Sequence, residues 1–289
     1  MGLGPRGAAV HGDRWPLAIC SWSLGGDVAG VATALRQLAI DRVNLALKPA
    51  LREGGEEYLA AVRRQAFSIS ATTIGFPQED YSTLESIRAT GGIVPDEYWP
   101  DNQRLVARAV ALTADLGVPY LTLHAGFIGG DDAAAAKRLR QRLTCLADEA
   151  GQHGITLLME TGQETAYALR ELLEELNHPA LGVNFDPANM ILYDKGDPVE
   201  AVRTLGPWIK HVHVKDAIRT TRPGTWGAEV PWGQGQVGTA AFLEALKAIG
   251  FTGTLAIERE TGDNRLGDIQ LAAERLAKAG RLLEPGGRS

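Results

Sequence analysis

Four side chains that can bind a divalent cation stand at the ends of four successive apolar runs in the second half of the chain. They are Glu160, Asp186, His213 and Glu258. Three carboxylates and one imidazole form a ligand set dominated by oxygen. Such a set suits Mn²⁺ first and Mg²⁺ or Co²⁺ next, with Zn²⁺ less favoured than at a site rich in His or Cys. A single acidic residue in such a place is more often a helix cap or part of a loop salt bridge. Because all four occur together, we predict one divalent-metal site.

The two-residue period of a β-strand predicts that these groups face a common interior. Asp186 lies on the side of its run opposite Phe185, and Glu258 lies on the side opposite Ile257. Carboxylates that face a protein interior lose several kcal/mol of hydration, and a bound cation is the simplest way to offset that loss.

Six further residues are candidates for substrate binding near the same site. They are His124, Asn189, Lys215, Arg219, Trp226 and Trp232. Aromatic rings suit the apolar faces of sugars, so the two tryptophans would form a lid. Each candidate also has a structural interpretation: a hydrogen-bonded histidine, a braced loop, an ion pair of Lys215 with Asp216, or a loop that its tryptophans pack onto the fold. His211 is better explained as a core histidine bonded to a neighbouring strand.

Eight short β-rich runs alternate with segments of helical period, and these elements must position the residues above. The predicted strands are 17–23, 42–47, 68–74, 119–125, 155–160, 181–186, 209–216 and 253–258. The predicted helices begin at Asp27, cover 55–65, run from Asp101 to Gly117, cover 132–152 and 165–176, begin at Asp197-Pro198, and cover 239–250 and 266–280. Residues 76–100 are predicted to form a loop that, through Tyr81, Tyr98 and Trp99, is either another wall of the mouth or an oligomer contact.

Eight βα units without an intervening linker match one closed (β/α)8 barrel of the α/β class, a TIM barrel, whose reactive groups lie at the C-terminal ends of the strands. We predict a barrel domain over 17–283, a flexible leader over 1–16 and a flexible tail over 284–289. A doubly wound open sheet is the alternative, but LGGDVAG after the first strand lacks the dinucleotide-binding glycine spacing. WGQGQVG lacks the residues of a phosphate loop, so no organic cofactor is expected.

The composition disfavours several classes of partner. The 289 residues include 29 Lys+Arg and 35 Asp+Glu, a net charge of −6, which disfavours nucleic-acid binding. No apolar run is long enough for a membrane span or a signal peptide. Cys20 and Cys145 show no zinc-ligand spacing and are predicted to be reduced core thiols, which favours a cytoplasmic protein.

Five segments of the second half resemble the xylose isomerase-like TIM barrels of the sugar phosphate isomerase/epimerase type. They are LMETGQET around Glu160, NFDPANM around Asp186, KHVHVKDA around His213, the Trp- and Gly-rich loop that follows, and GFTGTLAIERE around Glu258. The resemblance implies the same four residues as metal ligands and, as is common in that family, a homo-oligomer. Ketose 3-epimerases of the family generally carry His where this chain has Asn189 and Glu where it has Ala166. Both departures argue against epimerisation of a simple free ketose.

The function implied by this resemblance is a divalent-metal-dependent isomerase or epimerase whose substrate is a sugar, keto-sugar or cyclitol. Glu160 and Glu258 would transfer the proton through a metal-stabilised enediolate. The alternative is a keto-sugar or inosose dehydratase or lyase on the same metal site, including cleavage of 3-keto-glycosides or C-glycosides. An endonuclease IV-like phosphodiesterase is disfavoured, because the chain lacks the extra histidines and the basic surface. A non-catalytic sugar-binding barrel is the remaining alternative.

Overall fold

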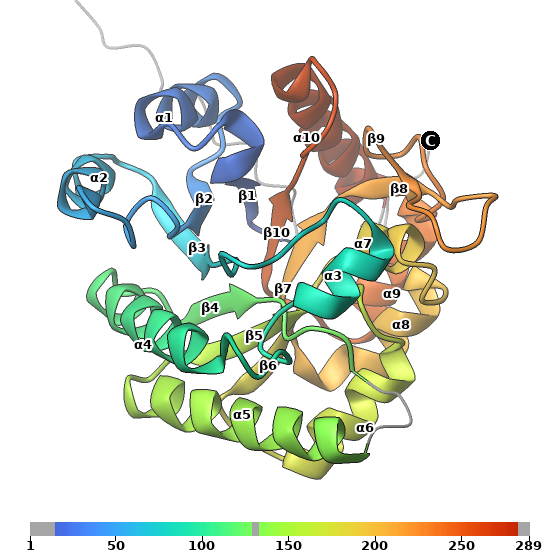
Figure 1. Cartoon of the computed structure of the whole chain (residues 1–289). Coiled ribbons are helices and arrows are strands. Elements are labelled where there is room, and N and C mark those ends of the chain that lie inside the picture. Colours follow the sequence, from blue (N-terminus) through green and yellow to red (C-terminus); the bar gives the residue numbers. More distant parts are fainter. Residues whose placement is uncertain (1–14, 129–132, 283–289) are drawn as a thin grey trace, which may run out of the picture.

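The computed structural model describes residues 15–128 and 133–282, and within them eight parallel strands close into a barrel (Figure 1). The barrel strands are β1 (Leu17–Cys20), β2 (Arg42–Ala46), β3 (Ser68–Thr73), β4 (Tyr120–Leu123), β5 (Thr156–Glu160), β6 (Leu181–Phe185), β7 (Ile209–Val214) and β10 (Thr254–Ile257). They follow the chain order around the ring, and β10 pairs with β1 to close it. The predicted (β/α)8 barrel is thus confirmed.

Helices surround the barrel on its outside (Figure 1). They are α1 (Val28–Gln37), α2 (Gly55–Arg63), α3 (Leu84–Thr90), α4 (Trp99–Asp115), α5 (Ala133–Gln152), α6 (Ala166–Leu176), α7 (Pro187–Leu192), α8 (Pro198–Leu205), α9 (Thr239–Ala248) and α10 (Arg265–Leu282). Two short 3₁₀ helices, η1 (Ser21–Leu24) and η2 (Gly206–Trp208), follow β1 and α8. A small antiparallel ribbon of β8 (Asp216–Ile218) and β9 (Ala228–Val230) lies between β7 and α9.

Local sequence signals explain where several helices begin. The Asp27 side chain accepts hydrogen bonds from Ala29 N and Gly30 N and so caps α1. Asp197 caps α8 in the same way, and a proline occupies the first position of that helix. These are the helix starts that the sequence predicted.

The hydrophobic core lies between the barrel and the helices, whereas the barrel interior is largely polar. Phe185 points outward from β6 and stacks on Phe242 of α9, with ring centroids 6.0 Å apart. Its neighbour Asn184 points inward and accepts a 2.9 Å hydrogen bond from Nδ1 of His211 on β7. The alternation along the strands therefore separates an apolar outer face from a polar inner face.

The structure differs from the predicted elements in three places. The predicted loop over 76–100 contains α3, which begins at a capping box formed by Thr83 and Ser86. The next helix was predicted to begin at Asp101 but begins at Trp99. Pro100 then lies in the first turn, where a proline is well accommodated. The predicted strand 209–216 is interrupted, since β7 ends at Val214 and Asp216 starts the ribbon strand β8.

The barrel body begins earlier than the predicted boundary at residue 17. Trp15, assigned by sequence to the leader, is buried, and its Nε1 donates a 2.6 Å hydrogen bond to the carbonyl oxygen of Phe251. The rest of the predicted leader, residues 1–14, and the predicted tail, residues 284–289, lie outside the described residues. The indole of Trp15 thus ties the start of β1 to the segment before β10.

The two cysteines have different environments. Both are free thiols, and Cys20 is buried as predicted, whereas Cys145 is exposed, so its prediction as a core thiol is wrong. Cys145 lies on α5, on a position that faces away from the buried side of that helix. Within the described ranges, no helix combines the length and apolar character needed to cross a membrane.

Candidate metal centre

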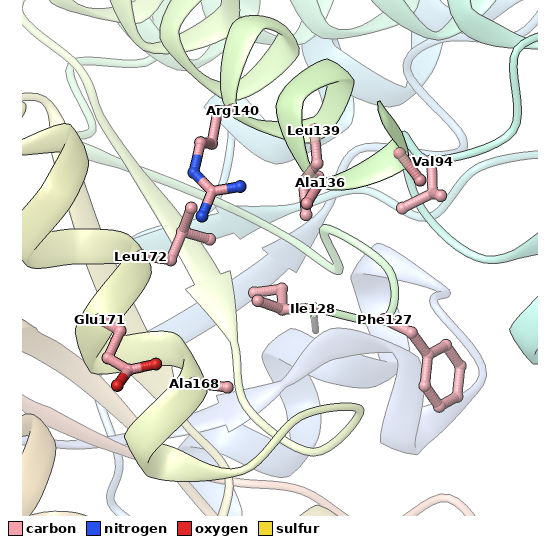
Figure 2. Close-up of a pocket in the computed structure, with 10 residues that line it drawn as sticks. Val94, Phe127, Ile128, Ala136, Leu139, Arg140, Ala168, Glu171 and Leu172 are labelled. Carbon is pink, nitrogen blue, oxygen red and sulfur yellow. The ribbon is translucent and has the colours of Figure 1, made fainter. Parts of the chain in front are cut away.

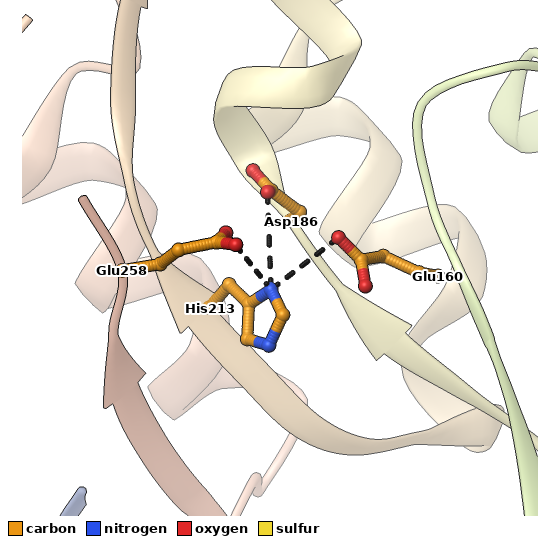
Figure 3. Close-up of side chains that lie close together, drawn as sticks. All are labelled: Glu160, Asp186, His213 and Glu258. Carbon is orange, nitrogen blue, oxygen red and sulfur yellow. Dashed lines mark ion pairs between the residues drawn. The ribbon is translucent and has the colours of Figure 1, made fainter. Parts of the chain in front are cut away.

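Glu160, Asp186, His213 and Glu258 come together at one end of the barrel (Figure 3). Each offers one ligand atom, these atoms all lie within 4.8 Å of one another, and all four residues are buried. Nδ1 of His213 lies 3.2 Å from a Glu258 oxygen, 3.4 Å from a Glu160 oxygen and 3.9 Å from an Asp186 oxygen. Three carboxylates therefore converge on one imidazole nitrogen.

The barrel brings the four residues together because its parallel strands end at the same rim. Glu160 is the last residue of β5, and His213 is the penultimate residue of β7. Asp186 and Glu258 directly follow β6 and β10. The four strands β5, β6, β7 and β10 are neighbours around the ring, so their ends form one continuous arc.

Asp186 is a helix cap and at the same time a candidate ligand. Its Oδ1 accepts hydrogen bonds from Ala188 N at 2.8 Å and Asn189 N at 3.0 Å, which caps α7. Its Oδ2 accepts no hydrogen bond from the described residues. The two interpretations of this residue are compatible, because each uses a different oxygen.

Glu258 is held in a similar way. Its Oε1 accepts a 2.6 Å hydrogen bond from Nε1 of Trp22 in η1. Its Oε2 is buried and has no hydrogen-bond donor among the described residues. The indole therefore orients the carboxylate so that the second oxygen faces the cluster.

Two buried carboxylate oxygens thus face the cluster without a hydrogen bond, an arrangement that costs about 1–3 kcal/mol for each group. Nζ of Lys215 lies 3.3 Å from the Glu258 oxygen and 3.7 Å from the Asp186 oxygen, which offsets part of this cost. A hard divalent cation at the point of convergence would satisfy both oxygens and Nδ1 of His213. The residues present therefore fit such an ion.

Neighbouring positive charges keep the two glutamates ionised. Burial raises the pKa of Glu258, but Lys215 and His213 more than offset this effect, so the pKa lies below its usual value. Burial also raises the pKa of Glu160, and His213 and His124 reverse that shift. A carboxylate must be ionised both to bind a metal and to accept a proton.

A cavity of about 580 Å³ reaches the cluster, and Glu160 and Glu258 line it. Its size lies within the range of small-molecule sites. The aromatic side chains in its wall are Trp22, Phe76, Tyr81, Tyr193 and Trp226. The cavity therefore combines apolar ring faces with ionised groups.

Four of the six predicted substrate-binding residues line this cavity, namely His124, Asn189, Lys215 and Trp226. Nε2 of His124 lies 3.7 Å from a Glu160 oxygen, and Asn189 donates a 3.1 Å hydrogen bond to the same carboxylate. Lys215 pairs with Glu260 rather than with the adjacent aspartate considered in the sequence. His124 and Asn189 thus contact the Glu160 carboxylate, and Lys215 and Trp226 line other parts of the cavity wall.

Arg219 and Trp232 lie elsewhere. The Arg219 guanidinium pairs with Asp194 and donates a 3.1 Å hydrogen bond to the carbonyl oxygen of Gly196. Trp232 is 3% exposed and packs edge-on against Phe242, with ring centroids 6.0 Å apart. Neither is among the residues that line the cavity. The predicted lid is thus reduced to Trp226, which packs edge-on against Tyr193 at 4.8 Å.

His211 and Asp216 have structural environments. Nδ1 of His211 donates to Asn184 at 2.9 Å, and its Nε2 lies 3.1 Å from Oγ of Ser70, so the predicted core histidine bonded to a neighbouring strand is confirmed. The Asp216 carboxylate accepts hydrogen bonds from the backbone amides of residues 217, 233, 235 and 237. It therefore holds the segment between β7 and α9 in a closed loop.

Sequence reasoning did not single out several residues of the cavity wall, among them Trp22, Glu79 and Tyr193. Trp22 follows β1, Glu79 follows β3 and Tyr193 follows α7. The position of Trp22 directly after a strand was a usable signal, since the residues after barrel strands build the mouth. Glu79 lies in segment 76–100, which was predicted as a possible wall; Tyr81 of that segment lines the cavity, whereas Tyr98 and Trp99 do not. Tyr193 carried no such signal, because it reaches the cavity only through tertiary packing.

A second, smaller cavity of about 210 Å³ lies between α5, α6 and the segment after β4 (Figure 2). Its wall is mainly apolar, with Ile128, Leu139 and Leu172, and its charged groups are Arg140 and Glu171. None of the four clustered residues lines it. The chemistry therefore belongs to the larger cavity.

Known relatives include an epimerase and a dehydratase. The chain is 29% identical over 193 residues to L-ribulose-5-phosphate 3-epimerase UlaE of Salmonella typhi, covering 62% of this chain and 65% of that protein. It is 32% identical over 99 residues to 3-dehydroshikimate dehydratase of Bacillus anthracis, covering 32% of this chain and 35% of that protein. The chain thus spans between about a third and two thirds of the length of these curated relatives.

The whole barrel has a similar solved structure and a matching family model. The crystal structure of a xylose isomerase domain protein from Planctomyces limnophilus superposes with a TM-score of 0.82 at 30% identity, covering 93% of this chain and 98% of that chain. The model of the xylose isomerase-like TIM barrels matches residues 33–280. The chain therefore belongs to the family of xylose isomerase-like TIM barrels.

Proposed function

We propose that this protein is a divalent-metal-dependent isomerase or epimerase of a sugar, keto-sugar or cyclitol. The observation that carries the proposal is the cluster of three carboxylates and one histidine beside a cavity of about 580 Å³, with two buried oxygens that lack hydrogen-bond donors. The similarity to an epimerase of a sugar phosphate supports a carbohydrate substrate.

The four clustered residues would hold the ion, with Mn²⁺ as the first expectation. Bound there, the ion would polarise the substrate carbonyl as a Lewis acid and so acidify the adjacent C–H bond. The chain itself would supply the groups that move the proton and hold the substrate.

Glu160 and Glu258 are the proposed acid and base. They lie on opposite sides of His213 (Figure 3), and both line the cavity. One ionised carboxylate accepts the proton from the carbon next to the carbonyl, and the other takes a proton from water and delivers it to the substrate. Return of a proton to the opposite face of the same carbon gives an epimer. Return of a proton to the neighbouring carbon moves the carbonyl along the substrate and gives an isomer.

Substrate hydroxyls would bind Lys215, His124 and Asn189, and Trp226 would pack on an apolar ring face. Burial lowers the pKa of His124, but Glu160 and Glu79 more than offset this effect, so its pKa is raised. A positively charged imidazole and the Lys215 ammonium can donate hydrogen bonds to substrate oxygens.

Incubation of the Mn²⁺-loaded protein with a panel of ketoses, keto-glycosides and inososes in D₂O tests this function. We expect deuterium at one substrate carbon, with the mass otherwise unchanged. The rate of this exchange should fall by more than about 100-fold in Glu160→Gln or Glu258→Gln. Glu175→Gln, which changes an exposed carboxylate paired with Arg140, is the matched control and should be fully active. Binding of sugars without any exchange or turnover would instead identify a non-catalytic sugar-binding barrel.

Elimination is the second candidate reaction. It needs the same proton abstraction and, in addition, a proton donor for the leaving oxygen. His124 and Lys215 supply two such donors in the cavity wall, and the similarity to a dehydratase is consistent with that chemistry. Loss of water or of an aglycone in the same D₂O experiment would assign the protein to this class.

A further inference from the structure

The two ring nitrogens of His213 face different oxygen acceptors, while Nδ2 of Asn184 lies 3.0 Å from Nε2 and 3.4 Å from Nδ1. Nδ1 faces the three carboxylates of the cluster. Nε2 faces the barrel interior, where Oδ1 of Asn44 on β2 lies 3.0 Å away. Neutral imidazole carries its hydrogen on one nitrogen only, and just the other nitrogen can bind a cation.

The orientation of the Asn44 amide follows from its other contacts. Its Nδ2 donates hydrogen bonds to the backbone oxygen of Ala71 at 2.9 Å and to Oγ1 of Thr73 at 3.0 Å. A carbonyl oxygen can only accept, so the NH₂ group must face β3 and the amide oxygen must face His213. Asn44 therefore presents an acceptor to Nε2.

A second amide approaches the same nitrogen but cannot take its hydrogen. Nδ2 of Asn184 lies 3.0 Å from Nε2 of His213 and 3.4 Å from a Glu160 oxygen. The oxygen of Asn184 is already bonded to His211. Asn184 thus presents a donor, and of these two amides only that of Asn44 can accept the hydrogen on Nε2.

We infer that Asn44 is a positioning residue for the metal ligand His213. This inference rests on the proposed metal site. The amide oxygen of Asn44 accepts the hydrogen on Nε2, which stabilises the tautomer whose Nδ1 lone pair points at the three carboxylates and fixes the ring plane. Partners of this kind typically contribute 10- to 100-fold to the metal affinity of a site.

The location of Asn44 separates this role from substrate binding. Asn44 is 0% exposed and is not among the residues that line the cavity. It also comes from β2, outside the arc of strands that carries the four ligands. Any effect of its substitution on the metal must therefore pass through His213 or through general stability.

Titration of metal-free protein with Mn²⁺ in a calorimeter, together with urea unfolding, distinguishes these two routes. Asn44→Leu removes the acceptor and should weaken Mn²⁺ binding 10- to 100-fold. Asn44→Asp keeps an acceptor for Nε2 but replaces the NH₂ group that bonds Ala71, so it should lower stability while leaving Mn²⁺ affinity close to that of the wild type. Asn102→Leu is the matched control, since Asn102 is equally buried and bonds only the Gly92 carbonyl oxygen; it should lose stability and retain the affinity.

The inference is overturned if Asn44→Leu folds and binds Mn²⁺ as the wild type does. If Asn44→Leu does not fold, the test rests on Asn44→Asp. An Mn²⁺ affinity of Asn44→Asp that falls together with the stability of that variant also overturns the inference. A spectroscopic check uses the Mg²⁺-loaded protein labelled with ¹⁵N-histidine, in which His213 should carry its hydrogen on Nε2; a hydrogen on Nδ1 contradicts the assignment. A wild-type protein that binds no Mn²⁺ refutes the proposed function itself, and with it this role.

Discussion

Asp186 and Glu258, two of the four candidate ligands, each use one oxygen to hold their position and leave the other without a hydrogen bond from the described residues. Oδ1 of Asp186 caps a helix, and Oε1 of Glu258 accepts the indole hydrogen of Trp22. The free atoms, Oδ2 and Oε2, are the buried ones without a hydrogen-bond donor among the described residues. The sequence predicted the four ligand residues from their place at strand ends, but not the groups that orient them. Those groups come from distant segments, and their contacts exist only in the closed barrel.

Asp186→Asn separates the two tasks of this side chain. The amide oxygen can still cap α7, while an NH₂ group replaces the oxygen that faces the cluster. We expect Mn²⁺ affinity to fall on the order of 100-fold or more with little change in the free energy of unfolding of the metal-free protein. Calorimetric titration and urea unfolding measure the two effects. Asp197→Asn, at the cap of α8, should leave metal binding unchanged.

Glu164 gives the stability of the protein a dependence on pH. Burial raises the pKa of this carboxyl to about 8 from a usual value of 4.5. The folded protein therefore binds a proton that the unfolded chain releases between these values, so stability falls as pH rises from about 4.5 to 8, by up to about 1.4 kcal/mol per pH unit. Urea unfolding of the metal-free protein at several pH values should show that the free energy of unfolding falls less steeply with pH in Glu164→Gln than in the wild type. An identical slope in the variant would contradict the assignment.

The segment between β7 and α9 is organised by one carboxylate. Asp216 accepts four backbone hydrogen bonds within this segment, which includes Trp226 of the cavity wall and Trp232 of the core. The sequence showed the two tryptophans and a loop rich in Gly and Pro, but not which ring faces the cavity. That choice depends on the ribbon of β8 and β9 and on packing against α9, and neither is encoded in the spacing of the tryptophans.

Asp216→Ala should release this segment. Loss of the acceptor leaves four backbone amides without their partner, and the two in buried hydrogen bonds, those of residues 217 and 237, cost about 1–3 kcal/mol each. We therefore expect a clear loss of stability confined largely to residues 217–238. Hydrogen exchange of the amides of residues 233, 235 and 237 should accelerate more than exchange in β5 or β6. Asp41→Ala, at an exposed ion pair, is the control and should leave these amides protected. Uniform acceleration across the barrel would show that Asp216 supports the whole fold instead.

At the scale of the molecule, the barrel followed from the sequence because it needs only the count, order and period of its elements. Runs such as 155–160 and 181–186 carry that information locally, and β5 and β6 are found within them. The metal cluster followed from the same regularity, since it depends on strand ends. The additional α3 and the particular positions of Glu79 and Tyr193 in the wall did not follow, because loop conformation depends on packing between distant segments.

A bound ion should stabilise the whole molecule. Ligand binding to the folded state adds about 2.7 kcal/mol at a concentration 100-fold above Kd, so Mn²⁺ should raise the melting temperature by several degrees. Differential scanning calorimetry with Mn²⁺, and again after addition of EDTA, measures the shift and its reversal. Asp186→Asn should show little shift at the same Mn²⁺ concentration. A wild-type melting temperature that does not change on addition of Mn²⁺ would contradict the proposed metal site.

Hydrogen bonds join the segments that flank β1 to the segments that flank β10. Trp15, just before β1, bonds the carbonyl oxygen of Phe251, and Trp22, just after β1, bonds the carboxylate of Glu258. Each acceptor lies 236 residues after its indole in the chain, so during synthesis neither hydrogen bond can form before residues 251 and 258 have left the ribosome. A nascent chain that ends before β10 would therefore carry three of the four clustered residues without the strand that closes the barrel.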